Sequence, residues 1–155
     1  MSYLSEVINS NLINLELKGK NKEEVIEELT DLLVKEQKIE SKNEFILRLD
    51  KRESINTTYC GSEIAIPHAI SDTVKTPAVC FGRSSGIFWN HKTDWVQFIF
   101  MFAIPKNNHD ENHISIMSDI ARCSLNQEIR REWSKATTKD QILETLRNEC
   151  EGNKD

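Results

Sequence analysis

Apolar and polar positions along the chain follow two different periods, one typical of strands and one of helices. Residues 12–17 alternate between apolar and polar side chains, which predicts an edge strand. The short apolar runs 64–66 and 78–81 predict further strands, and the second should stop at a glycine turn over residues 82–86. Residues 95–104 are the most hydrophobic segment and predict a central strand buried on both faces.

Three helices should begin at polar residues that are followed three positions later by Glu or Gln, a typical capping pattern. These residues are Asn21, Ser41 and Thr138. The first helix should continue to about Ile39, and the second should end near Arg52 and Glu53. Apolar spacing predicts further helices within 114–121 and 125–133.

Interleaved helices and strands predict an α/β fold, a single layered domain in which a mixed β-sheet is flanked by helices on both sides. The chain has 155 residues, of which 38% are hydrophobic, enough for a substantial core without a structural metal. We therefore expect one domain over residues 1–155, with a frayed end over about 148–155.

Charge and hydropathy narrow the classes of partner. The net charge is −5 and basic residues are scattered among acidic ones, which argues against a nucleic-acid partner. No apolar run approaches the roughly 20 residues that span a bilayer, and the N-terminus lacks a signal-peptide pattern. We predict a cytoplasmic protein with no direct membrane insertion. The cysteines are too far apart for a Cys-x-x-Cys motif, so we expect reduced, mostly buried thiols at Cys60, Cys80, Cys123 and Cys150.

Two motifs suggest enzymes but fit poorly. His109 and His113 are spaced for one helix face, yet the zinc protease pattern needs Glu directly after the first histidine, where Asp110 stands. Residues 82–86 match Gly-x-Ser-x-Gly, with Asp94 and His113 following, but no helix start follows as a hydrolase requires. Nucleotide-binding glycine motifs are also absent from the sequence. We predict no metal and no cofactor.

His68 is the strongest candidate for chemistry. It follows the apolar run 64–66 and Pro67, which cannot donate to a sheet, so the strand should end there and His68 should leave the sheet. The surrounding residues resemble the signature of the type-2 enzyme IIA domains of the bacterial sugar phosphotransferase system, the fructose and mannitol class. Glu53, Gly61 and the run Ile64 to Ala69 fit that signature, and Cys60 occupies its apolar position.

The resemblance implies an enzyme, a phosphotransferase with a phosphohistidine intermediate. His68 would accept a phosphoryl group from the histidine-containing phosphocarrier protein HPr and pass it to a IIB component, which serves the membrane IIC component. Arg52 and His113 stand at the matching positions for stabilising the phosphoryl group, and Thr58 is a possible hydroxyl donor. A regulatory, nitrogen-type IIA protein that signals by phosphorylation-dependent binding is the alternative that the motif leaves open.

Overall fold

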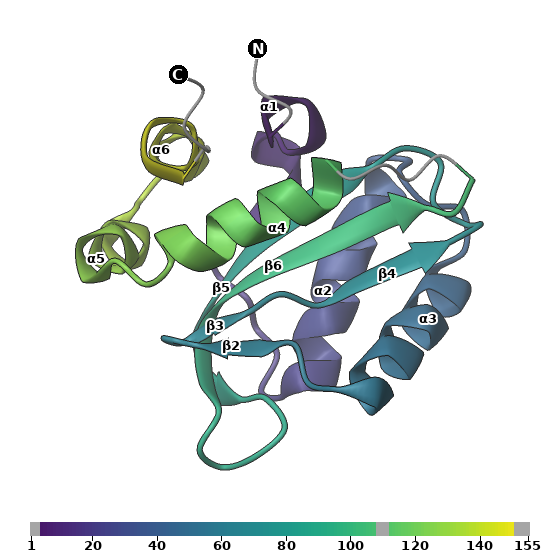
Figure 1. Cartoon of the computed structure of the whole chain (residues 1–155), viewed down its shortest axis with the longest axis horizontal. Helices are drawn as coiled ribbons and strands as arrows, with labels where there is room; N and C mark the ends of the chain where they lie inside the picture. The colour runs from purple at the N-terminus through teal and green to yellow at the C-terminus, as the bar shows by residue number, and fades with distance from the viewer. Residues whose placement is uncertain (1–3, 108–111, 151–155) are drawn as a thin grey trace.

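The computed structural model describes residues 4–107 and 112–150, which form a mixed six-stranded sheet with helices on both faces (Figure 1). The strands are β1 (Ile13–Asn14), β2 (Tyr59–Gly61), β3 (Ile64–Ala65), β4 (His68–Ser71), β5 (Ala78–Phe88) and β6 (Trp95–Pro105). Their order is β1-β5-β6-β3-β2, and β4 also pairs with β6. Strands β5 and β6 are antiparallel, whereas β3 and β4 run parallel to β6. The predicted α/β fold is confirmed.

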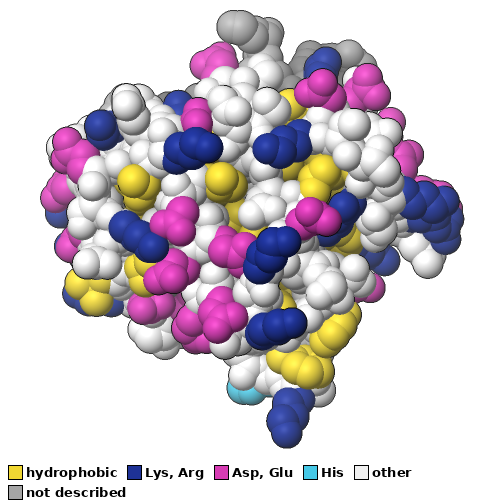
Figure 2. All heavy atoms as spheres, turned by 180° about the vertical axis from the view of Figure 1, so that it is seen from behind, with side chains coloured by type: hydrophobic (Ala, Val, Ile, Leu, Met, Phe, Trp, Pro, Cys, Tyr) yellow, Lys and Arg dark blue, Asp and Glu magenta, His cyan; other side chains and the backbone are white. Residues whose placement is uncertain are grey.

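The helices are α1 (Leu4–Val7), α2 (Lys22–Lys35), α3 (Lys42–Ile55), α4 (Asn112–Cys123), α5 (Gln127–Lys135) and α6 (Lys139–Thr145), with short turns η1 (Ser10–Leu12) and η2 (Leu146–Cys150). Helices α2 and α3 cover one face of the sheet, and α4 lies across the other (Figure 1). Helix α2 packs against β5 and α3 against β4. Figure 2 shows the α2 and α3 face, on which basic and acidic side chains are interspersed. None of the described helices has the length and hydrophobicity to cross a membrane.

The predicted helix starts are confirmed, because each capping side chain accepts a hydrogen bond from an amide three positions on. These side chains are Asn21, Ser41 and Thr138, the last in a complete capping box. Helix α2 ends at Lys35, short of Ile39, since Gln37 takes a left-handed conformation with φ 60° and Ile39 then bridges to Val74. The predicted strand over 12–17 is present at the sheet edge as β1 alone.

The core confirms β6 as the central buried strand, with Phe98 and Phe100 almost fully buried. Their rings and that of Phe81 surround Trp133 of α5, with centroid separations of 5.3 to 6.1 Å. On the opposite face, the Cys80 thiol contacts the Leu29 carbonyl of α2 at 3.6 Å. One face of the sheet is thus covered by α5 and the other by α2.

The prediction of a glycine turn over residues 82–86 is wrong, because β5 continues through these residues with a register shift. Gly86 has φ 123°, and the indole of Trp95 packs so closely that an added Cβ would lie 1.9 Å from it. Ser84 is buried, and its hydroxyl donates to the Val96 carbonyl. The Gly-x-Ser-x-Gly match therefore forms no strand-to-helix elbow.

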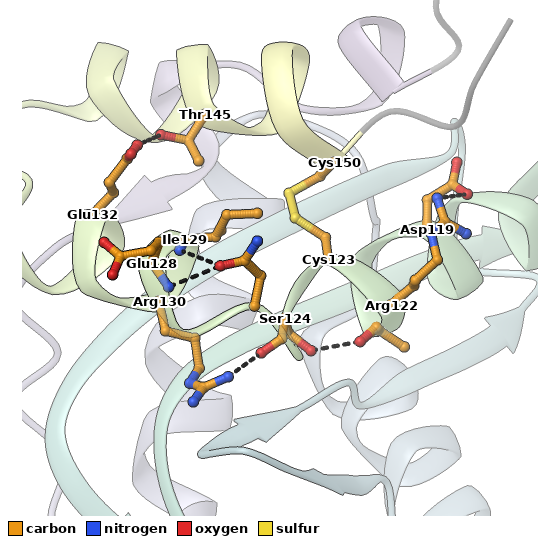
Figure 3. Close-up of a disulfide and its surroundings, with 12 residues drawn as sticks. Asp119, Arg122, Cys123, Ser124, Glu128, Ile129, Arg130, Glu132, Thr145 and Cys150 are labelled. Atoms are coloured by element: carbon orange, nitrogen blue, oxygen red, sulfur yellow. Dashed lines mark hydrogen bonds and ion pairs between the residues drawn. A yellow bond between two sulfur atoms is a disulfide. The ribbon is translucent and has the colours of Figure 1, made fainter.

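Cys123 and Cys150 form a disulfide with 5.1 Å between their Cα atoms (Figure 3), so the prediction of four reduced thiols is wrong. The bond joins the end of α4 to η2, and the fully buried Cys150 anchors that turn. Fraying was expected from Asn148, but η2 continues to Cys150 because this residue is held in the core. Residues 151–155 lie outside the described part of the chain.

Candidate functional site

Pro67 interrupts the sheet just before His68. His68 was predicted to leave the sheet, and this prediction is wrong. It begins β4 and is in register with Phe102 of β6. Strands β3 and β4 both pair in parallel with β6, and the Phe102 amide donates to the Pro67 carbonyl at 2.9 Å across the break. The backbone that carries His68 is therefore fixed on both sides of the proline.

Both ring nitrogens of His68 have a defined partner. Nδ1 lies 3.0 Å from the Ile66 carbonyl oxygen, and Nε2 lies 3.2 Å from Nε of Arg52. Because a carbonyl oxygen only accepts, Nδ1 carries the proton, and the lone pair resides on Nε2. Burial is the main cause that lowers the pKa of His68, and Arg52 adds to it, while the Ile66 contact opposes it. The ring is therefore neutral near neutral pH, with a nucleophilic Nε2.

Arg52 is held over Nε2 by a second contact, in which its Nη1 donates to the Asn56 carbonyl at 2.7 Å. Asn56 caps the C-terminus of α3, so the guanidinium also satisfies a carbonyl at the helix end. A guanidinium with free donors beside a nucleophilic nitrogen suits an incoming anionic group.

Thr58 is buried, and its hydroxyl donates to the carboxylate of Glu53, while its amide lies 3.4 Å from the same carboxylate. A hydroxyl has one proton, so the predicted donation from Thr58 to a phosphoryl group is not made in this arrangement. Glu53 was noted as part of the motif, but its contact with Thr58 was not predicted, because a motif position does not show which atoms meet.

His68, Arg52 and Thr58 line one open cavity of about 340 Å³. Its opposite wall is formed by α4 and includes Ile114, Met117, Ser118 and Ala121. Helical spacing at i, i+3, i+4 and i+7 places these four on one face. The apolar spacing over 114–121 predicted the helix but not which of its faces borders the site, and Ile114 is 56% exposed there.

His113 lies in the first turn of α4 and lines a smaller cavity against β5 and β6, not the cavity that holds His68. It is the last of the causes that lower the pKa of His68, after burial and Arg52. His109 and Asp110 of the metal alternative lie outside the described residues. Among residues 4–107 and 112–150, no group of three His, Cys, Asp or Glu side chains is placed to hold a metal ion.

Cys60 also lines the His68 cavity. Partial burial raises the pKa of its thiol, and the nearby carboxylate of Glu53 raises it further. The nucleophilic thiolate is therefore scarce at neutral pH. Nε2 of His68 is the better nucleophile in this cavity.

These features define an α/β domain with one neutral, guanidinium-facing histidine in an open cavity. The sequence profile described as "Phosphoenolpyruvate-dependent sugar phosphotransferase system, EIIA 2" matches residues 6–149. The chain belongs to this family.

Individual relatives agree with the family assignment. The "PTS system fructose-specific EIIA component" of Haloferax volcanii is 32% identical over 145 residues, covering 92% of this chain and 94% of the relative. The "PTS system fructose-specific EIIABC component" of Bacillus subtilis is 29% identical, but the chain spans only 23% of its length.

Solved structures show the same architecture. The mannitol IIA of Escherichia coli has a TM-score of 0.76 at 26% identity, covering 90% of this chain and 98% of that one. The nitrogen regulatory protein IIA-Ntr of Neisseria meningitidis has a TM-score of 0.85 at 23% identity, covering 94% and 99%, and shows the shared fold.

Proposed function

We propose that this chain is a phosphoryl carrier of the sugar phosphotransferase system, with Nε2 of His68 as the acceptor atom. The observation that carries the proposal is the orientation of that ring, whose Nδ1 proton is held by Ile66 and whose Nε2 faces Arg52 in an open cavity. The donor is HPr and the acceptor is a IIB component, which serves a membrane IIC component. The chain acts in the cytoplasm.

The transfer step follows from the ring geometry. The Nε2 lone pair attacks phosphorus, a new P–N bond forms, and the P–N bond to the donor imidazole breaks, so the electron pair returns to the donor ring. Arg52 turns its Nε donor from the ring nitrogen to the phosphoryl oxygens, on which the transition-state charge is spread. His113 supplies a second hydrogen-bond donor from the first turn of α4. Thr58 supports the site through Glu53 and does not donate to the phosphoryl group.

The relatives support the choice of partners. One solved relative is described as a complex of enzyme IIAMtl with phosphorylated enzyme IIBMtl of Escherichia coli, at 25% identity and a TM-score of 0.76. The relatives at 29% and 32% identity are both named as fructose-specific components of the phosphotransferase system. The likeness to the nitrogen regulatory protein is one of fold, so the transport role is preferred to a regulatory one.

The test is to incubate the purified chain with phosphoenolpyruvate, enzyme I and HPr, and to follow its intact mass. Wild type should gain one acid-labile phosphoryl group and His68→Ala none. Arg52→Ala should accept the group about 10²- to 10³-fold more slowly, as when one transition-state donor is removed. Arg48→Ala is the matched control, since Arg48 lies one turn earlier on α3 and pairs with Glu44 on the surface.

Rapid labelling of His68→Ala would remove His68 from the mechanism. An unchanged rate in Arg52→Ala would show that the guanidinium does not stabilise the transferred group. Subsequent loss of the label on adding a IIB component would establish transfer onward, and a label that stays on the chain with every IIB component would contradict the transport role.

A further inference from the structure

A buried ion pair lies behind the phosphoryl-acceptor cavity. Nζ of Lys22, at the start of α2, is 3.6 Å from Oε1 of Glu53 on α3, and the side chains are only 14% and 6% exposed. Burying two charges is costly, and a buried pair is weak support for stability by itself. We therefore expect this pair to have a role other than stabilising the fold.

Lys22 connects the pair to a distant loop. Its Nζ donates to Oδ1 of Asn90 at 2.6 Å, and Nδ2 of Asn90 donates to Oγ1 of Thr57 at 2.6 Å. Oγ1 of Thr57 also accepts from the Tyr59 amide at 3.1 Å. The ammonium lies 5.6 Å from the centre of the buried Trp89 ring, a cation–π distance. The segment 57–59, which lines the cavity, is thus tied to α2 and to the β5–β6 loop.

Glu53 connects the pair to His68 by a continuous series of hydrogen bonds. Its carboxylate accepts from the Thr58 hydroxyl, the Thr58 carbonyl accepts from the Ile66 amide at 3.0 Å, and the Ile66 carbonyl holds Nδ1 of His68 at 3.0 Å. That last contact selects the ring tautomer. Any shift of Thr58 therefore reaches the nitrogen that reacts.

We propose that Lys22 and Glu53 are positioning residues for phosphoryl transfer, which fix the tautomer and orientation of His68 through Thr58 and Ile66. This inference rests on the proposed function. Glu53 holds the loop, and Lys22 neutralises the carboxylate so that it does not repel the incoming phosphoryl group, which brings about two negative charges. Neither residue touches the transferred group.

Two nearly isosteric variants separate these contributions. In Glu53→Gln, an amide in place of the carboxylate cannot accept at both oxygen positions, so an NH₂ group opposes either Thr58 or Lys22. In Lys22→Met, the stem is kept and Glu53 stays buried without its partner. Each should lower the single-turnover rate with phosphorylated HPr about 10- to 100-fold, as expected for small misplacement of a reacting atom.

The control is Lys42→Met, which removes an ion pair of 2.8 Å between Lys42 and Asp31 that also joins α3 to α2, but at the surface. Its rate should stay within about twofold of wild type, as is usual for exposed pairs. The HPr concentration that gives half the maximal rate should be unchanged in all three variants, because docking is not affected. In the double variant Lys22→Met/Glu53→Gln the losses should not multiply, since the two residues act on one contact series.

A tautomer measurement tests the same idea without any phosphoryl transfer. Long-range ¹H–¹⁵N NMR spectra should show a single Nδ1-protonated tautomer of His68 in wild type and in Lys42→Met, and a mixture in Glu53→Gln and Lys22→Met. A single tautomer with wild-type rates in folded Glu53→Gln and Lys22→Met would overturn the proposal, as would an equal loss in Lys42→Met. If wild type accepts no phosphoryl group, the proposed function fails, while the NMR comparison still decides the positioning role.

Discussion

Reduction of the Cys123–Cys150 disulfide should strongly destabilise the protein. The bond closes a loop with a sequence separation of 27, for which the chain-entropy relation predicts about 3.5 kcal/mol at 25 °C. The loop contains α5 and α6, and the bond fixes η2 against the end of α4 (Figure 3). In the unfolded chain, reduction releases this constraint, and the gain in unfolded-state entropy favours unfolding.

Urea unfolding measures the effect directly. With an m-value of about 1–3 kcal/mol per molar, reduction should lower the midpoint by about 1.2–3.5 M. The matched control is the double variant Cys123→Ala/Cys150→Ala, whose midpoint should not respond to reductant. Thiol titration of the unfolded chain should find two free thiols before reduction, at Cys60 and Cys80, and four after it.

Four free thiols in the unreduced chain would show that the bond is absent. If two thiols are freed by reduction and the midpoint moves by less than about 0.3 M, the loop-entropy reasoning is refuted for this protein.

Two further predictions concern His68 and a glycine. Burial lowers the pKa of His68 below 6.5, so an NMR titration of its ring should have a midpoint under that value, and a midpoint at or above it would contradict the burial argument. Because the unfolded chain binds this proton more readily, wild type should lose stability relative to His68→Ala as pH falls below about 6.5 and not above it. Gly86→Ala should cost about 2–4 kcal/mol, since its Cβ meets the Trp95 ring, whereas Gly61→Ala has open space and should cost only about 1–2 kcal/mol of backbone strain. Urea midpoints of the two glycine variants check this, and equal losses would refute the packing argument.

The sequence predicts those features that depend on local chemistry. The caps at Asn21, Ser41 and Thr138 act on amides three residues away, and all three are confirmed. Residues 95–104 predict the central strand because their hydrophobicity fits only a segment covered on both faces. His68 and Arg52 were also predicted to act together, although by resemblance and not by any local rule, and they are in contact.

Features that depend on distant neighbours were missed. Gly86 looks like part of a turn, but the glycine is required by the ring of Trp95 on the adjacent strand. Cys123 and Cys150 carry no local signal of pairing, since only the packing of η2 on α4 brings them together. The Thr58 hydroxyl donates to Glu53, only five residues away, but the direction of that proton is set by the local geometry and not by the residue types.

The pairing of β3 and β4 with β6, before and after Pro67, limits how the molecule could signal the proposed phosphorylation of His68. Because β6 holds the backbone before and after the proline, we expect the chain trace to be nearly the same with and without a group on His68. A partner that distinguishes the phosphorylated from the unphosphorylated form must then recognise the added negative charge and the rearranged Arg52 side chain, because the backbone conformation is expected to be the same in both forms.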